Sequence, residues 1–298
     1  MEKEFDYAAL MCEVRRLANR FSFLNFSYLT ESEAGRAIPM LSLGVGKKQI
    51  YYIGAHHGAE RITSAVLIKF ISEFCNFLAR GATAFGTDLE YVLQTRTIRI
   101  VPMLNPDGVE ISANGVQSDS LWYTRLVAMN GGSLDFTHWQ ANARGVDLNH
   151  NYDAGFEEYK EVEKTLGITG PGATRYSGER AESEAESSAL CNFLRFNPPA
   201  ALMTLHTQGR EIYYSSCGSY TKGAKAAAEY LSRLTGYKCA VPIGAAAYGG
   251  LTDYCIQKLK IPAFTIECGK GKNPLPPHDT LPIYLEMRKA LFAFLTLF

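Results

Sequence analysis

The stretch QIYYIGAHHGAERITSAVLIKFISEF, residues 49–74, joins an apolar run to a long amphipathic segment through two histidines and a glutamate. The run QIYYIGA (49–55) is rich in aromatic and β-branched residues without alternating polarity, which predicts a strand covered on both faces. The periodicity of residues 60–79 predicts a helix. A buried strand that leads directly into a helix indicates an α/β fold, with the histidines at the junction.

The same pattern recurs along the chain. Further strands are predicted at 97–104, 200–205 and 262–268, and further helices at 182–195, 221–234 and 282–297. Residues 105–180, rich in Gly, Asn, Asp and Ser, read as long irregular loops of the kind that carry function. We therefore expect one domain over residues 1–298, with a mixed, mostly parallel central sheet and helices on both faces, a three-layer α/β/α architecture.

Composition narrows the classes of partner. The chain has 30 Lys and Arg and 30 Asp and Glu, so it lacks the basic excess with which proteins bind nucleic acid. We expect that no apolar run approaches the roughly 18 residues that span a bilayer, and the N-terminus lacks the apolar core of a secretory signal. Seven scattered cysteines suit free thiols in a reducing compartment. We expect a cytoplasmic protein without membrane contact, and its oligomeric state is left open.

Three predicted strands end in polar residues that suit metal chemistry. Residues 49–55 lead into His57 and Glu60, 200–205 into His206, and 262–268 contains Glu267. Sites in α/β sheets gather at the carboxyl ends of strands. A catalytic zinc takes three His, Glu or Asp ligands and keeps one open position. The spacing alone leaves the alternative open, because His-x-x-Glu is frequent by chance and a histidine at a strand end is more often a core residue.

The order of further motifs is more specific, and it resembles the zinc carboxypeptidase family typified by pancreatic carboxypeptidase A. The matching motifs are HGAE at 57–60, NPDG at 105–108, GVDLNHNYDAGF at 145–156, TLHTQG at 204–209, GGLTDY at 249–254 and FTIECG at 264–269. The resemblance implies a peptidase that acts on peptide substrates with one Zn²⁺ held by His57, Glu60 and His206. His57, and not His56, has the family's spacing to Glu60.

The resemblance also assigns two carboxylates. Asp147 matches the family's carboxylate that hydrogen-bonds the first zinc histidine, which fixes the tautomer of that ligand. Glu267 matches the general base that takes a proton from the attacking water and passes it to the leaving amine. A turn-forming role for Asp147 is the alternative.

The sequence departs from the family where substrate is held. The family's Asn-Arg pair, which binds a terminal carboxylate, reads Asn149-His150 here, and histidine is only partly charged near neutrality. Gln140 stands where the family has the arginine that polarises the scissile carbonyl. Arg144 is the nearest cation and is predicted to replace it, with a solvated loop arginine as the alternative.

Two further departures concern residues near the metal and the Gly pair. Ala59 replaces an arginine before the zinc glutamate, and Ala245 stands in place of the family's mobile tyrosine. Tyr248, next to the Gly pair, is a candidate substitute for substrate binding, although packing is the simpler role.

Three stretches resemble a bacterial subgroup, the γ-D-glutamyl-meso-diaminopimelate peptidases, which cut peptidoglycan stem peptides. These stretches are WQANARGVDLNHN at 139–151, HTQGREIY at 206–213 and IECGKGKNPLP at 266–276. Such a substrate carries charges beyond the scissile bond, and the candidates to meet them are Arg210, Thr252 and Asp253.

Two other functions are compatible with the sequence. One is a general metallocarboxypeptidase or amidohydrolase acting on small peptides. The other is a metal-free protein that binds peptides on the same fold, which the missing arginines favour and the retained Glu267 opposes.

Overall fold

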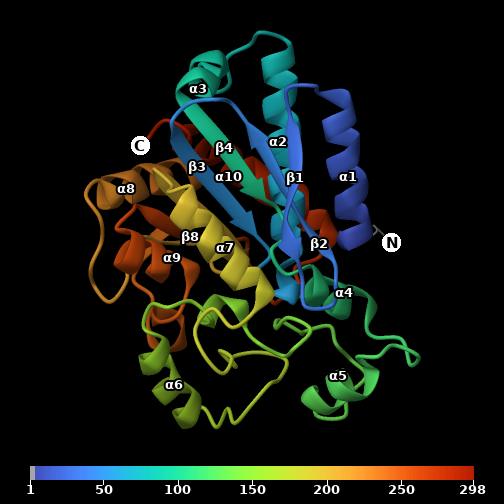
Figure 1. Ribbon diagram of the computed structural model, residues 1–298. Helices are drawn as coiled ribbons and strands as arrows, with labels where there is room; N and C mark the ends of the chain where they lie inside the picture. The colour runs from blue at the N-terminus through green and yellow to red at the C-terminus, as the bar shows by residue number, and fades with distance from the viewer. Residues whose placement is uncertain (1–3) are drawn as a thin grey trace.

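One eight-stranded sheet organises the computed structural model, which describes residues 4–298 (Figure 1). The strand order is β1-β2-β4-β3-β5-β8-β6-β7. The strands are β1 (Asn25–Glu31), β2 (Ala37–Leu43), β3 (Lys48–Gly54), β4 (Arg96–Val101), β5 (Ala201–Thr207), β6 (Glu211–Tyr213), β7 (Lys238–Ala240) and β8 (Ala263–Cys268).

The middle of this sheet is parallel and its flanks are not. Strands β4, β3, β5 and β8 run parallel to one another. On one side β2 joins β4 antiparallel and β1 joins β2 antiparallel, and on the other side β6 joins β8 antiparallel and β7 runs parallel to β6. The four parallel strands are the four apolar runs predicted from the sequence, and β5 is buried along its whole length. Burial on both faces explains why their sequences are continuously apolar. The prediction of a mixed, mostly parallel sheet is confirmed.

Helices cover both faces of the sheet. One face packs against α1 (Tyr7–Arg20), α2 (Ile62–Ala79), α8 (Ala224–Thr235) and α10 (Thr280–Phe294). The other packs against α7 (Ala185–Phe196) and α9 (Leu251–Tyr254), which lie in front of the sheet in Figure 1. In β3, Tyr51 faces the second core and Tyr52 the first, as expected for alternating side chains. The three-layer prediction is confirmed.

The predicted loop region from 105 to 180 contains more regular structure than its composition indicated. It forms α4 (Pro106–Asn114), α5 (Tyr123–Met129) and α6 (Phe156–Thr165). Asn105 caps α4 through its side chain, and Pro106 occupies the first turn, where a missing N–H costs nothing. The remaining short elements are α3 (Leu89–Thr95), η1 (Gly58–Glu60), η2 (Leu148–His150), η3 (Gly244–Ala247), η4 (Cys255–Leu259) and η5 (Pro277–Asp279).

The expectation that no segment is long and apolar enough to span a bilayer was wrong. The helical segment Gly58–Ala79 meets both criteria by length and composition. Its apolar residues have another explanation, because most of α2 is buried between the sheet, α1 and α10. A core helix covered on several sides needs this composition.

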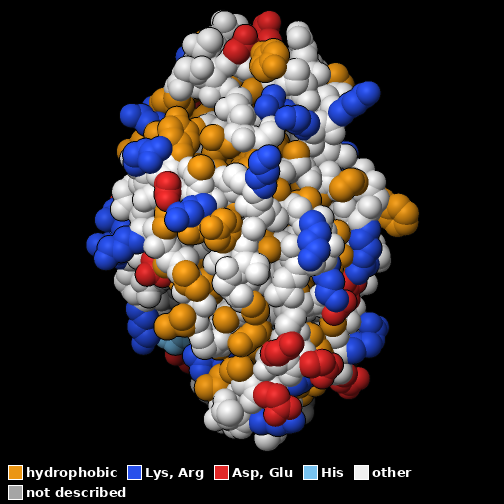
Figure 2. Space-filling view, turned by 90° about the vertical axis from the view of Figure 1, so that its left-hand side faces the viewer, with side chains coloured by type: hydrophobic (Ala, Val, Ile, Leu, Met, Phe, Trp, Pro, Cys, Tyr) orange, Lys and Arg blue, Asp and Glu red, His pale blue; other side chains and the backbone are white. Residues whose placement is uncertain are grey.

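Charged side chains are interspersed on the face seen in Figure 2. Lys and Arg side chains lie scattered among hydrophobic and neutral ones there, while acidic ones gather near the lower end. This face therefore offers no continuous basic surface of the kind that follows a nucleic-acid backbone.

Candidate active site

Three neighbouring parallel strands deliver the predicted site residues to one edge of the sheet. His57 follows the end of β3, His206 lies near the end of β5, and Glu267 lies near the end of β8. His206 and Glu267 are direct partners in the β5–β8 register, so their side chains leave the same face. Distant segments thus meet because parallel strands align their carboxyl ends.

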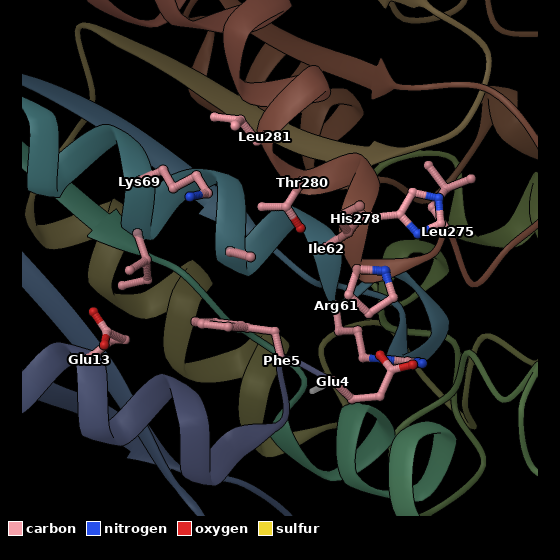
Figure 3. A pocket seen from close by; sticks show the side chains of 13 residues that line it. Glu4, Phe5, Glu13, Arg61, Ile62, Lys69, Leu275, His278, Thr280 and Leu281 are labelled. Carbon is pink, nitrogen blue, oxygen red and sulfur yellow. The ribbon is translucent and has the colours of Figure 1, made fainter. Parts of the chain in front are cut away.

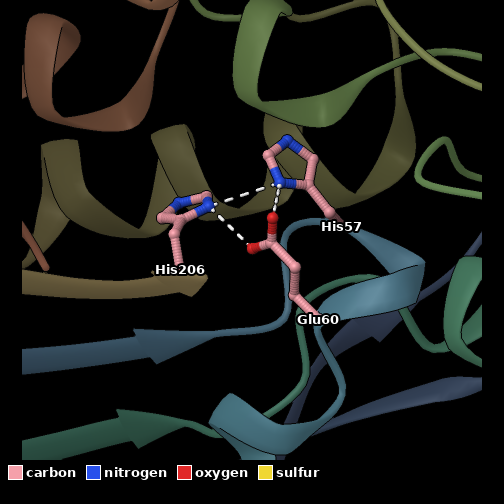
Figure 4. A group of neighbouring side chains, drawn as sticks. All are labelled: His57, Glu60 and His206. Carbon is pink, nitrogen blue, oxygen red and sulfur yellow. Dashed lines mark hydrogen bonds and ion pairs between the residues drawn. The ribbon is translucent and has the colours of Figure 1, made fainter. Parts of the chain in front are cut away.

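The three predicted zinc ligands converge on one point (Figure 4). Nδ1 of His57 lies 2.9 Å from Oε1 of Glu60, and Nδ1 of His206 lies 3.1 Å from Oε2 of the same carboxylate. The two Nδ1 atoms are 3.3 Å apart. Such crowding of electron-pair donors in a buried place suits a shared cation, and His₂Glu is a donor set of catalytic zinc. The residues present therefore fit the metal.

Asp147 orients the first of these ligands, as predicted. Its Oδ1 lies 3.1 Å from Nε2 of His57, so the imidazole proton sits on Nε2 and Nδ1 is left free to bind metal. Burial opposes ionisation of Asp147, but His57, His150 and the N–H of Arg175 outweigh it and hold its pKa well below the usual value. Asp147 is therefore a permanent acceptor.

We expect Asp147→Asn to weaken zinc binding about 10- to 100-fold, because the amide loses the charge that strengthens His57 as a ligand. Competition with a chromogenic chelator would measure the affinity. Asp153→Asn is the matched control, since Asp153 is exposed and, in the described part of the chain, is paired only with Lys258. An unchanged affinity in Asp147→Asn would contradict the role.

Close packing of two glycines fixes the turn that carries the ligands. A Cβ on Gly58 would lie 2.2 Å from the carbonyl oxygen of Gly108, and one on Gly108 would lie 2.3 Å from that of Ala141. Between them, Asn105 donates to the carbonyl of His56 at 2.9 Å. The HGAE and NPDG motifs therefore belong to one packed unit, in which only glycine allows the approach.

His56 has a supporting role at the back of the site. It is fully buried, with Nε2 3.1 Å from the Tyr152 hydroxyl and Nδ1 3.2 Å from Oγ1 of Thr204. Its ring stacks on His206 with centroids 5.1 Å apart. The geometry therefore makes His57, and not His56, the metal ligand.

Asn273 supports the metal site, although the sequence did not single out its role. Its Nδ2 donates to the carbonyl of Thr207 at 2.9 Å and lies 3.4 Å from Oε1 of Glu60. The Thr207 hydroxyl donates back to Oδ1 of Asn273 at 2.7 Å. The stretch GKGKNPLP therefore braces the ligand-bearing end of β5.

A cavity of about 450 Å³ opens beside the metal ligands. Its walls include His57, His206 and Glu267. Burial raises the pKa of Glu267 to about 8, and the charge of Glu60 adds to this, whereas His57 opposes it. A carboxyl group next to the metal position, in contact with the substrate cavity, has the place expected of a general base.

A second cavity, of about 470 Å³, lies elsewhere, between residues near the N-terminus, α2 and η5 (Figure 3). Arg61 there is paired with Glu4 at 2.6 Å and faces Ser112. None of the three metal ligands lines it among the residues described. The first cavity, and not this one, is therefore the candidate active site.

Asn149 and His150 both line the active-site cavity, as predicted for substrate-binding residues. Oδ1 of Asn149 accepts the Leu251 N–H at 3.3 Å, which ties it to the Gly-pair loop. The His150 ring stacks on Tyr159 at 3.8 Å, and its Nδ1 donates to the Tyr248 carbonyl at 2.9 Å. Burial lowers the pKa of His150, so the imidazole is neutral near pH 7.

Arg144 is not in the cavity, which corrects the prediction that it polarises the carbonyl. Its guanidinium lies 3.6 Å from Glu184 and 3.8 Å from Glu33. Its N–H donates to Asn142, so the turn before Gly145 carries the side chain toward these acids. Two carboxylates on that side attract it more than the cavity does.

Arg210 and Tyr248 also lie outside the cavity lining, against expectation. Arg210 is ion-paired with Glu286, whose carboxylate also accepts the Tyr237 hydroxyl. The Tyr248 ring packs over Gly155, and only its carbonyl meets the site, through His150. The other two candidates near the Gly pair, Thr252 and Asp253, do line the cavity.

The lining contains a cation that sequence reasoning missed. Arg175 is part of the cavity wall, together with Thr174 and Gln140. It lies in the loop after α6, where no strand or helix periodicity marks it. The one sequence feature that could have pointed to Arg175 is its position directly before the turn YSG at 176–178. In the structure this loop lies against Asp147, to which the N–H of Arg175 donates.

The acids beside Arg144 form a buried cluster that gives a pH-dependent prediction. Burial raises the pKa of Glu186 to about 8, and Asp107 and Glu33 add to this. A group with a raised folded-state pKa stabilises the fold below its unfolded-state pKa, and this contribution is lost as pH rises through the folded-state value.

We therefore expect the stability of Glu186→Gln relative to the wild type to rise between pH 5 and pH 8, by on the order of 3 kcal/mol. Urea unfolding at several pH values would measure it. Glu161→Gln, at an exposed position paired with Lys164, should show no such trend. A pH-independent difference for Glu186→Gln would contradict the prediction.

Comparison with known proteins agrees with this geometry. The model of the family described as "Zinc carboxypeptidase" matches residues 13–290. Gamma-D-glutamyl-L-diamino acid endopeptidase 1 of Lysinibacillus sphaericus is 32% identical over 286 residues, covering 96% of this chain and 70% of that protein.

Solved structures share the fold at low sequence identity. Thrombin activatable fibrinolysis inhibitor aligns with a TM-score of 0.74 and 16% identity, covering 98% of this chain and 73% of that one. Carboxypeptidase A from Helicoverpa armigera aligns with a TM-score of 0.71 and 16% identity, covering 98% and 75%. Because the family model matches most of its length and its three ligands converge, the chain belongs to the zinc carboxypeptidase family and is a zinc metallopeptidase.

Proposed function

We propose that this enzyme hydrolyses the γ-D-glutamyl–diamino acid amide bond of peptidoglycan stem peptides. The observation that carries the proposal is the 32% identity, over 96% of this chain, to a protein named for cleavage of that bond. The proposal is supported by the close grouping of the three zinc ligands, by the hydrogen bond of Asp147 to His57 and by the position of Glu267 in the cavity wall.

The cavity supports an enzyme that does not depend on a terminal carboxylate clamp. At the position of the family's clamp arginine, His150 is neutral, stacked on Tyr159 and hydrogen-bonded to a backbone carbonyl. A permanent bidentate cation is therefore missing from that place. The wall also carries polar side chains, among them Asn149, Thr252 and Asp253, which suit a substrate with charged groups on both sides of the scissile bond.

The protein's own residues divide the work of hydrolysis. When bound, zinc supplies Lewis-acid polarisation of the scissile carbonyl and acidifies the attacking water. A carboxylate oxygen of Glu267 accepts the proton from that water as it attacks, and then delivers it to the nitrogen of the leaving amine. Asp147 keeps the proton of His57 on Nε2 throughout, so the ligand does not change its tautomer.

A product screen by mass spectrometry would test the proposal. Defined stem peptides with a γ-linked D-Glu–diaminopimelate bond are compared with the same peptides linked through the α-carboxyl, and with ordinary peptides. We expect release of the diamino acid fragment from the γ-linked peptides only, and no release by Glu267→Gln. Cleavage confined to ordinary peptides would overturn the proposal and favour the general carboxypeptidase.

We further propose that the enzyme acts in the cytoplasm, on recycled or precursor wall peptides. The support is its thiol chemistry: the seven cysteines are all free, and four of them are buried. Free thiols suit a reducing compartment. Cell fractionation with an antibody against the native protein would test this, and recovery outside the cytoplasm would overturn it.

A further inference from the structure

Arg175 is the only Lys or Arg among the residues described that line the active-site cavity. The other charged groups of the wall are acids and imidazoles, including Asp147, Asp253 and Glu267. Of these acids, Asp147 stays ionised, and so does the nearby Glu60, because neighbouring imidazoles lower the pKa of both carboxyl groups. In such a cavity a substrate carboxylate is bound most favourably beside a permanent cation.

The guanidinium of Arg175 is free to receive such a group. Within residues 4–298 it makes no hydrogen bond, ion pair or cation–π contact, and the residue is exposed to solvent. Arg144 and Arg210, the two arginines that the sequence had suggested, are both engaged by carboxylates. Arg175 thus differs from them in having its donors open on the cavity side.

The backbone of Arg175 is held in a conformation that a side chain rarely adopts. Its φ is +67°, in the left-handed region, which costs about 1–2 kcal/mol for a residue other than glycine. Two contacts fix it: its N–H donates to Oδ2 of Asp147 at 3.0 Å, and its carbonyl accepts the Tyr159 hydroxyl at 3.2 Å. Arg175 is therefore anchored to the same carboxylate that orients His57, and its position is tied to the metal site.

We propose that Arg175 binds a substrate carboxylate beside the scissile amide and thereby selects anionic peptides. This inference rests on the proposed function for the identity of the peptide. In a γ-linked stem peptide the carboxylate is either the free α-carboxylate of D-Glu, on the acyl side, or a carboxylate of the diamino acid, on the amine side. Planar guanidinium and carboxylate form two parallel charge-assisted hydrogen bonds, which a lysine or a neutral amide does not reproduce.

The test compares enzyme variants with substrates that keep or lack each carboxylate. The variants, all zinc-loaded, are Arg175→Gln and Arg175→Gly, with Arg180→Gln as the control from the same loop. Arg180 is exposed and, among residues 4–298, its guanidinium donates only to backbone carbonyls. Arg175→Gly relieves the positive φ, so it should fold at least as well as the wild type. The substrates are stem peptides in which the D-Glu α-carboxyl or a diaminopimelate carboxyl is free or amidated.

We expect the wild type and Arg180→Gln to prefer one free carboxylate over its amide about 10- to 100-fold in kcat/KM. Both Arg175 variants should lose that preference and cut the amidated peptide as the wild type does. The substrate pair that loses its preference identifies the carboxylate. If instead the Arg175 variants retain the preference, or lower kcat/KM equally for all substrates, the proposal is overturned.

A binding measurement separates this inference from the proposed function. Calorimetric titration of the same peptides into Glu267→Gln, with and without Arg175→Gln, reports the carboxylate contact without turnover. If the wild type cuts no γ-linked peptide, the proposed function fails. The binding data still test the Arg175 contact in that case. A 10- to 100-fold difference in affinity between free and amidated peptides that disappears in Arg175→Gln supports the contact, and any other result overturns it.

Discussion

Glu267→Gln should lower kcat by roughly 10²- to 10⁴-fold while zinc binding is retained. Glutamine keeps the size and position of the side chain on β8 but can neither accept the proton of the attacking water nor pass it to the leaving amine. His57 and Glu60 remain in place, because they are held by Asp147 and Asn273, and His206 remains beside Glu60 at 3.1 Å. Single-turnover rates with a cleavable peptide, together with zinc analysis of the same sample, would measure both quantities.

The control for this change is Glu161→Gln, at an exposed position on α6, which should keep wild-type activity. Retention of a tenth or more of the wild-type kcat by Glu267→Gln would show that another group acts as base. Loss of zinc along with activity would show that Glu267 supports the metal and would remove it from the proton transfer.

Removing the metal is expected to abolish turnover and to destabilise the fold. Glu60 and His206 are almost fully buried, and the two Nδ1 atoms and the carboxylate face each other at 2.9–3.3 Å. A cation that binds only the folded state stabilises it by about 4 kcal/mol when free zinc is a thousand times Kd. Thermal unfolding with and without a chelator, beside activity measurements, would show both effects.

His206→Ala supplies the comparison for that experiment, because it removes one of the three ligands. The melting temperature of His206→Ala should not respond to zinc or to chelator. Adding zinc back after chelation should restore the activity of the wild-type protein and leave His206→Ala inactive. Metal analysis should find one zinc ion per wild-type chain. Full activity in chelated protein with no detectable metal would contradict the assignment.

The buried centre of the fold was predictable and its margins were not. Strands β3, β4, β5 and β8 are covered on both faces, so their sequences carry a continuous apolar signal. Strands β6 and β7 have three residues each, and β1 is largely exposed. Such short or half-exposed edges lack that signal, and pairing with neighbours far along the chain is what makes them strands.

Some residues of the active site were likewise predictable from the sequence and others were not. His57, Glu60, His206, Asp147 and Glu267 could be identified from the sequence, because their chemistry and their places at strand ends and in one motif restrict where they can lie. The arginine that lines the cavity could not be identified in this way. Arg144 and Arg210 turn to nearby carboxylates, whereas Arg175 reaches the cavity from a loop after α6.

The amino-acid sequence by itself therefore determined the α/β core, the zinc ligands and the carboxylate that we propose as general base, since each depends on residue type at positions that the strand pattern already orders. Only the tertiary structure decided which arginine lines the active-site cavity. That choice depends on a left-handed backbone at Arg175, held by Asp147 and Tyr159, and on competition between the cavity and acids elsewhere, both of which exist only once distant segments have packed.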